Sequence, residues 1–278
     1  MFLPLNPKRL LGRKNHLMQR GFLRGLAAFL SMGLAASVLA DAEPEFSAYS
    51  GRAVGSKGEF LYTEHHIMKH QEGRIRERVV LYQCADGAPF ARKTASYVQS
   101  VAPDFVFEDS SNGVREGVRD DGASRTVFFR AGHDAPEKTA TLKLGPDGVI
   151  DAGFDEFIRE NWRSLVAGHT LTMHFLVPSR LSSMDFHVRY LGSGAEQSTG
   201  EMFRLEVAGL LKWVAPSIDV SYTPDDHALV RYQGLSGLRD QKGENLHATI
   251  TFRTEDRRRA DAVAFSAAVQ APLAPCRN

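Results

Sequence analysis

The amino-acid sequence predicts an α+β protein that is mostly β. The expected fold is a large curved antiparallel sheet, half-barrel-like, with one main amphipathic helix packed on it. Three observations support this fold class. Apolar and polar residues alternate with a period of two along most of residues 59–252. Clusters of Gly, Pro, Asn and Asp separate the alternating runs at short intervals. Residues 154–165 instead repeat their apolar side chains at helical spacing.

The first group of strands comes from alternation in residues 59–144. Two tight turns, Asp86-Gly87 and Asn112-Gly113, are typical of hairpins and divide this group. Regular short strands joined by such turns favour an antiparallel meander. The predicted strands cover residues 59–68, 78–84, 90–98, 104–108, 125–130 and 139–144.

The predicted helix follows these strands. Asp155 and Glu156 lie in its first turn, where the helix dipole favours acidic groups. Gly168 lies just past its end, where glycine tolerates a left-handed conformation. The helix is expected to lie across one face of the sheet, through an apolar stripe made of Phe154, Phe157, Ile158, Trp162 and Leu165.

Strands resume after the helix and bring the expected total to about ten to twelve. Residues 178–183 are predicted to be a loop, and residues 234–245 a Gly-rich polar loop. Residues 210–216 are compatible with a strand or with a helical turn. The later strands are predicted in residues 171–177, 184–190, 203–207, 218–222, 229–232 and 246–252.

Residues 1–40 have the pattern of a secretory signal peptide. They hold six Lys and Arg residues and no Asp or Glu, and end in an uncharged run that closes on Val38-Leu39-Ala40. Met18 is an alternative start that would leave a shorter leader. The other interpretation, an uncleaved anchor, is less favoured because the uncharged run, residues 25–40, is shorter than the roughly 20 residues that a spanning helix needs. The sequence therefore predicts export, to the periplasm or beyond, and no membrane span after cleavage.

Residues 41–278 are expected to form a single β-rich domain. They carry 28 basic against 33 acidic residues, a net charge of −5. A mildly acidic domain without a basic stripe is a poor candidate for binding nucleic acid. The sequence gives no indication of the oligomeric state.

The two cysteines, Cys84 and Cys276, are predicted to form a disulfide. An even cysteine count in an oxidising compartment favours pairing. The bond would tie the C-terminal tail to an early strand. Two unpaired thiols are the alternative.

Three segments resemble signatures of an uncharacterised family of exported bacterial β-rich proteins. They are residues 151–155 (DAGFD), 175–181 (FLVPSRL) and 232–240 (YQGLSGLRD). The resemblance covers most of residues 41–278. It implies export and a single domain, and because the family has no known activity it transfers no functional residue.

No motif assigns a catalytic residue. Gly234-Leu235-Ser236-Gly237 begins like the turn that presents a nucleophilic serine, but Leu238 stands where the last glycine belongs. That turn also needs a strand followed by a helix, whereas the pattern here is antiparallel β. Ser236 is therefore interpreted as part of a polar turn, and no cofactor is predicted.

Four residues are weak candidates for a metal site. Glu64 and His66 share a face of one predicted strand, about 7 Å apart along it. His174 and His187 would fall opposite each other if the loop at 178–183 closed a symmetric hairpin. A metal site needs three or more converging ligands, so solvated or hydrogen-bonded histidines are the favoured interpretation.

The aromatic residues give the main functional indication. Phe105-Val106-Phe107 and Phe128-Phe129 are apolar on both faces of their strands. Both faces of such a sheet must be covered or must line a cavity. A filled core is the alternative. If the helix covers the concave face incompletely, an apolar groove for a lipid-like ligand remains, with candidate lining residues Phe105, Phe107, Phe175, Phe186 and Trp213.

Three functions follow from these features. A periplasmic binding or carrier module for an apolar or lipid-like ligand is the leading hypothesis. An envelope scaffold that binds other proteins through a sheet edge is the second. A metal-dependent hydrolase built on the histidines is the third, so an enzyme is the less favoured expectation.

Overall fold

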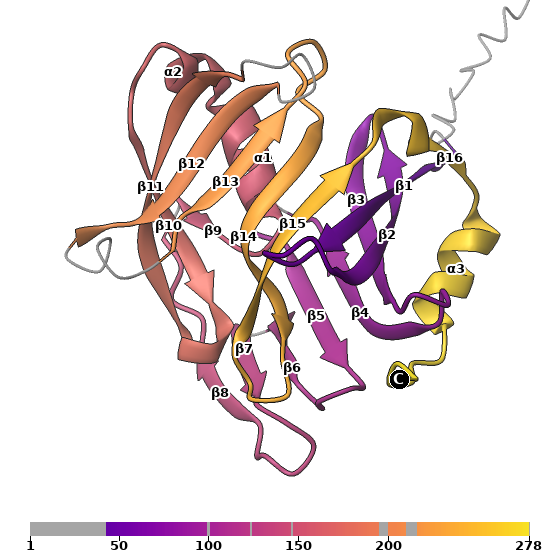
Figure 1. Cartoon of the computed structure of the whole chain (residues 1–278). Coiled ribbons are helices and arrows are strands. Elements are labelled where there is room, and N and C mark those ends of the chain that lie inside the picture. Colours follow the sequence, from indigo (N-terminus) through magenta and orange to yellow (C-terminus); the bar gives the residue numbers. More distant parts are fainter. Residues whose placement is uncertain are drawn as a thin grey trace, which may run out of the picture. The chain divides into compact units, whose positions relative to one another are not determined.

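The computed structural model describes residues 43–98, 101–122, 124–145, 147–194, 200–209 and 216–277. The predicted leader, which includes the alternative start Met18, lies outside these residues. The candidate lining residue Trp213 also lies outside them. Residues Ala42–Asn278 form one compact unit, whose described part contains a sheet of sixteen strands (Figure 1). The strands are β1 (Glu45–Val54), β2 (Phe60–Gln71), β3 (Arg74–Gln83), β4 (Pro89–Ser96), β5 (Asp104–Asp109), β6 (Arg115–Asp120), β7 (Arg125–Arg130), β8 (Lys138–Thr141), β9 (Gly148–Val149), β10 (Leu171–Val177), β11 (Ser182–Ser193), β12 (Glu201–Val207), β13 (Ile218–Tyr222), β14 (Leu229–Arg239), β15 (Asn245–Phe252) and β16 (Arg258–Ala260).

The sheet is strongly curved, as its topology requires. The strand order runs from β8 through β1 and β15 to β9, with β16 beside β1. In a flat sheet the outermost strands, β8 and β9, would lie about 67 Å apart, because neighbours are spaced by about 4.8 Å. Yet only the six residues between Thr141 and Gly148 join them, and seven steps of chain reach about 25 Å at most. The two ends of the sheet must therefore curl toward each other.

Packing agrees with this curvature. Leu176 of β10 belongs to the same buried cluster as Val127 of β7, from the opposite part of the strand order. The short 3-10 turn Pro178–Arg180, after β10, also packs against β6 and β7. The predicted half-barrel-like sheet of an α+β protein is thus confirmed. Its strands pair antiparallel except β9, which pairs parallel with β10.

The predicted helix is present as two short pieces. α1 (Gly153–Glu160) and α2 (Trp162–Val166) are separated at Asn161, whose φ of −103° and ψ of 11° are not helical. Ile158 and Leu165 are fully buried against Phe203 and its neighbours on β11–β14. The break lets the apolar stripe follow the curved sheet.

A further helix, α3 (Ala262–Gln270), was not predicted. Its nine residues are mostly Ala and Val with a weakly directional apolar pattern, so the helical period is hard to recognise in the sequence. α3 packs on the outer face of the sheet, where Ala268 joins a small buried cluster with Ile67 and Val79. These two residues alternate with the inward side chains of β2 and β3, so α3 and α1 cover opposite faces.

The disulfide between Cys84 and Cys276 is present and fastens the tail that follows α3. The Cα atoms of the two cysteines lie 5.6 Å apart, and the two residues are 192 positions apart in the sequence. Arg92 Nη1 also donates to the carbonyl of Ala271 at 2.9 Å. Free thiols are absent among the described residues. The predicted connection between the tail and an early strand is therefore confirmed.

Two expectations about strands were wrong. Sixteen strands are described where ten to twelve were predicted. β6 shows the reason, because its sequence REGVRD has low intrinsic β propensity and becomes a strand by pairing with β5 and β7. Ser236 lies inside β14 and not in a polar loop, since β14 continues to Arg239 with a register shift between Leu235 and Arg239.

Both faces of β7 are covered, as its two adjacent phenylalanines require. Phe128 is fully buried, with the guanidinium groups of Arg115 and Arg119 about 5 Å from its ring centroid. Phe129 points to the other face and packs on the main cluster. No helix in the described part of the chain is long and apolar enough to span a membrane.

Candidate ligand-binding cavity

A cavity of about 380 Å³ lies against the concave face of the sheet, beside the start of α1. Protein interiors pack closely and contain few voids larger than one water molecule, about 30 Å³. The cavity instead falls in the range of about 300–1,000 Å³ that is typical of small-molecule sites. Its apolar wall includes Val80, Phe105, Phe107, Phe154, Met173, Phe175, Leu176, Phe186, Leu205, Val207, Ile218, Leu229, Ile250 and Phe252.

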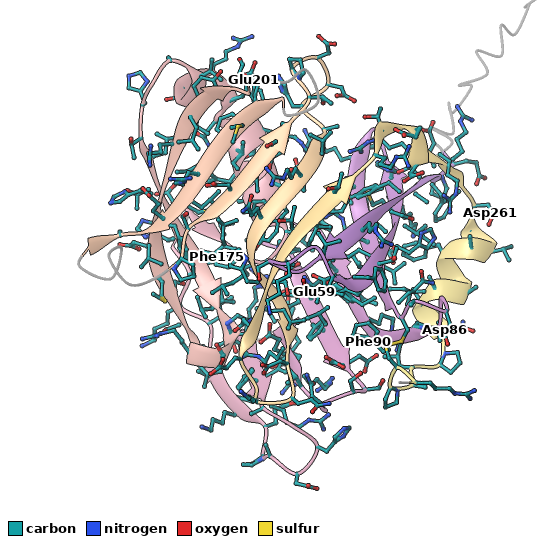
Figure 2. The ribbon with its side chains drawn as sticks, viewed as in Figure 1. Glu59, Asp86, Phe90, Phe175, Glu201 and Asp261 are labelled. Atoms are coloured by element: carbon teal, nitrogen blue, oxygen red, sulfur yellow. A yellow bond between two sulfur atoms is a disulfide. The ribbon has the colours of Figure 1, made fainter. Side chains whose placement is uncertain are left out.

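Four predicted phenylalanines border this cavity. Phe105 and Phe107 are buried and alternate along β5, which places them on one face of the strand. Phe175 of β10 (labelled in Figure 2) and Phe186 of β11 meet edge to face, with 5.8 Å between ring centroids. Side chains from distant parts of the strand order thus meet at one space, and their contact with a ligand remains a prediction.

Polar side chains form a row across the apolar wall. The strand register aligns Tyr49 of β1, His66 of β2, Val80 of β3 and Lys93 of β4. The row continues over Phe107 to Glu116 of β6. All of these side chains line the cavity. The cavity therefore has an apolar body with a few polar groups, an arrangement that can orient an amphipathic ligand.

Lys93 is neutralised by Asp151, which lies in the turn before α1. Lys93 Nζ donates to Asp151 Oδ1 at 2.5 Å, and both side chains are less than one fifth exposed. Burial lowers the pKa of Lys93, but the surrounding groups, with Asp151 first among them, together raise it above its usual value, so the ammonium stays charged. Asp151 Oδ2 is buried without a hydrogen bond. Lys93 was not singled out in the sequence.

Glu64 and His66 bind each other. His66 Nε2 lies 2.9 Å from Glu64 Oε2, and the imidazole stacks on Tyr49 with 4.4 Å between centroids. Burial lowers the pKa of His66 although Glu64 raises it, so the imidazole is neutral at pH 7. Across the described residues, no group of three or more His, Cys, Asp or Glu side chains is arranged to hold a metal.

The other two metal candidates do not face each other. His174 pairs with Asp185 across β10 and β11, and His187 with Thr172. The predicted register was wrong because strand pairing resumes at Ser182, one residue after the 3-10 turn, opposite Val177. His174 Nδ1 instead contacts Asp185 Oδ1 at 2.6 Å on the surface. This agrees with the interpretation of hydrogen-bonded histidines.

Glu116 is an acidic group in an unfavourable environment. Burial raises the pKa of its carboxyl to about 7, against the opposing influence of Arg239 and Lys93. Among the described residues, neither Arg239 nor Lys93 forms an ion pair with Glu116. Arg239 donates to the carbonyl of Gly243 and lies over the ring of Phe129. Glu116 therefore changes charge near neutral pH at the cavity wall.

Arg78 also lines the cavity and was missed in the sequence. It lies on β3 and is 7% exposed. The signal was present, since Arg78 alternates in phase with Val80 and Tyr82, which face inward. A charge in the inward phase of an otherwise apolar run is a marker of a polar site.

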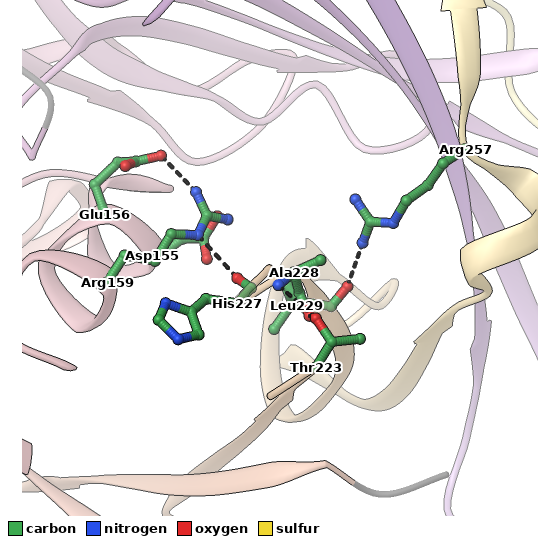
Figure 3. Close-up of polar contacts among 8 residues, drawn as sticks. All are labelled: Asp155, Glu156, Arg159, Thr223, His227, Ala228, Leu229 and Arg257. Carbon is green, nitrogen blue, oxygen red and sulfur yellow. Dashed lines mark hydrogen bonds and ion pairs between the residues drawn. The ribbon is translucent and has the colours of Figure 1, made fainter. Parts of the chain in front are cut away.

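A second arginine, Arg159 of α1, forms ion pairs with the nearby carboxylates (Figure 3). It donates to Asp155 Oδ2 at 2.5 Å and to Glu156 Oε1 at 2.8 Å. Its Nε also reaches the carbonyl of His227, at 3.1 Å. Arg159 thus fixes α1 to the turn before β14 and leaves these acidic groups paired.

No protein-family model and no curated protein matches the chain. Among solved structures, the chain is similar to a β-barrel-like protein from Brucella abortus, described as a domain of unknown function, DUF1849. The likeness has a TM-score of 0.34 and 9% sequence identity, and covers 78% of this chain and 98% of the other. It says nothing about what this chain binds.

Proposed function

We propose that this protein is an exported binding or carrier module for an apolar or lipid-like small molecule. The observation that carries the proposal is the cavity of about 380 Å³ with six phenylalanines in its wall. A filled core would leave no such space. Binding the ligand would bury the exposed apolar wall, at about 25 cal/mol for each Å² removed from water.

Export is part of the proposal. The basic and then apolar leader in residues 1–40 supports it. The disulfide between Cys84 and Cys276 also supports it, because such bonds persist in oxidising compartments. In such a compartment a soluble carrier would shield an apolar molecule from water.

The first test is a native mass spectrum of the exported protein. The full chain is expressed, and the exported protein is purified from the same cells. We expect a bound mass of lipid size that is lost on extraction with organic solvent. The second test uses N-phenylnaphthylamine, an uncharged dye that fluoresces in apolar surroundings. We expect saturable binding of one dye per chain.

Two variants locate the dye. Val207→Trp fills space at the cavity wall and is expected to weaken dye binding at least about tenfold, by steric exclusion. Thr172→Phe is the matched control, since Thr172 is exposed on the strand that carries Met173 and Phe175. Equal binding by wild type and Val207→Trp, or no binding by the wild type, would refute the proposed function.

A further inference from the structure

Arg78 is a buried cation that the described residues leave without an ion-pair partner. Its side chain makes no hydrogen bond or ion pair among the described residues, and its Nε is buried and unsatisfied. The guanidinium makes a cation–π contact with the ring of Tyr97, whose centroid lies 5.7 Å from Arg78 Cζ. A guanidinium offers five N–H donors and stays charged in proteins. Burying it without an acceptor is costly, and so its position calls for an anionic partner.

The chain's own carboxylates near Arg78 do not meet this need. Asp155 and Glu156 contribute to the field at Arg78 but lie beyond ion-pair distance. Both are held by Arg159. Asp155 Oδ1 is unsatisfied, yet the charge of its carboxylate is already compensated by Arg159. His66 is neutral, as derived above.

A second guanidinium reinforces the positive charge. Arg257 Cζ lies 5.0 Å from the ring centroid of Tyr49 and has no carboxylate partner among the described contacts. It donates to the carbonyl of Leu229 at 2.8 Å (Figure 3). Burial and Asp155 raise the pKa of Tyr49, while Arg78 and Arg257 lower it, so both cations act on the same hydroxyl group.

The other cations of the cavity wall are less available. Lys93 is paired with Asp151. Arg239 also has a buried, unsatisfied Nε, but it donates to the carbonyl of Gly243 and lies over the ring of Phe129. Arg78, by contrast, is next to the apolar wall, because the register places it beside Ala95 of β4 and Ala95 beside Phe105 of β5. A ligand whose anionic group binds Arg78 could therefore place an attached apolar tail over Phe105.

We propose that Arg78 binds the anionic head group, a carboxylate or a phosphate, of an amphiphile whose tail lies along Phe105 and Phe107. This inference rests on the proposed function and specifies its ligand class. Carboxylate and phosphate both match the fork of a guanidinium, and charge-assisted bonds of this kind are the strong ones. The arms of the test below distinguish the two.

The test displaces N-phenylnaphthylamine with amphiphiles that share one alkyl chain: dodecanol, dodecanoate, dodecyl phosphate and dodecyltrimethylammonium. Wild type is expected to bind at least one of the two anions about tenfold or more tightly than dodecanol, and the ammonium most weakly. The tighter of the two anions identifies the head-group class. No preference for an anion over dodecanol in the wild type would overturn the inference.

Variants assign the preference to one residue. Arg78→Gln is expected to abolish the preference for anions while dodecanol affinity changes less than about twofold. Arg78→Lys keeps the charge but loses the fork, so we expect a reduced preference that remains. Arg204→Gln is the matched control, because Arg204 pairs with Asp219 on the opposite face of β12, and it should leave the preference intact.

The outcomes separate the two proposals. Unchanged anion preference in Arg78→Gln, with dodecanol still bound, would refute the role of Arg78 and leave the proposed function standing. If neither the dye nor any amphiphile binds wild type, the proposed function itself fails. A thermal melt of each variant confirms that it is folded. If Arg78→Gln does not fold, the wild-type panel and Arg78→Lys decide.

Discussion

Lys93 and Asp151 form a buried ion pair of 2.5 Å that joins β4 to the turn before α1. The two residues lie 58 positions apart in the sequence. The pair therefore fastens the helix to the curved sheet at the wall of the cavity. Its burial makes it more consequential than an ion pair on the surface, because removal of one partner leaves the other charge uncompensated.

Asp151→Asn is expected to lower the free energy of unfolding by about 3 kcal/mol, because the ammonium of Lys93 would remain buried without a carboxylate. Urea denaturation measures this change. Asp121→Asn is the control, since Asp121 forms an exposed pair with Arg119 and should cost less than about 0.5 kcal/mol. Equal effects of the two variants would contradict the prediction.

Glu116 should make the protein less stable as the pH rises toward 8. Burial raises the pKa of this carboxyl from 4.5 to about 7 in the folded state. Between these values the folded chain holds a proton that the unfolded chain has released. The contribution of Glu116 to stability is thus complete below about pH 4.5 and is lost as the pH rises through about 7.

Glu116→Gln removes that titration. The variant is expected to lose less stability than wild type between about pH 5 and pH 8, and to be the more stable protein at about pH 8. Urea denaturation at several pH values measures the slopes. Glu72→Gln, at an exposed site, should follow the wild-type slope. Parallel curves for Glu116→Gln and wild type would rule out the raised pKa.

Removal of the disulfide should destabilise the protein and release α3. We expect Cys84→Ser with Cys276→Ser to lower the free energy of unfolding by about 2–5 kcal/mol, because the bond closes a long loop. Thermolysin should then cut faster beside Phe265 of α3. Intact mass with and without reductant provides the control on bond formation. Unchanged cleavage would show that α3 is held by its packing on Ile67 and Val79 alone.

Arg78→Met should stabilise the ligand-free protein while it abolishes anion preference. Replacing an unpaired buried cation with an apolar side chain of similar length removes its desolvation cost, a gain of about 1–3 kcal/mol. Differential scanning calorimetry after organic extraction measures the change. Arg159→Met is the contrast, since it breaks pairs with Asp155 and Glu156 and should destabilise. A destabilised Arg78→Met would argue for a structural role.

Alternation in the sequence determined which side chains of a strand share a face of the sheet. Phe105 and Phe107 share a face because successive side chains of a strand point to opposite faces, wherever that strand lies. The helical spacing of Ile158 and Leu165 likewise fixed the buried face of the helix. These are local consequences of backbone geometry, so the sequence alone could predict them. The cysteine count predicted the disulfide from chemistry and compartment.

Only the tertiary structure decided what these faces enclose. The turn at Pro178 closes at a different residue from the predicted one, so His187 lies opposite Thr172 and not opposite His174. Register depends on where a turn closes, and a small difference there displaces every later pair. The encounter of Lys93 with Asp151, and the lack of an ion pair at Arg78 among the described residues, depend on how far the sheet curls. That curvature is set by contacts between residues far apart in the chain, and alternation along one strand contains no information about them.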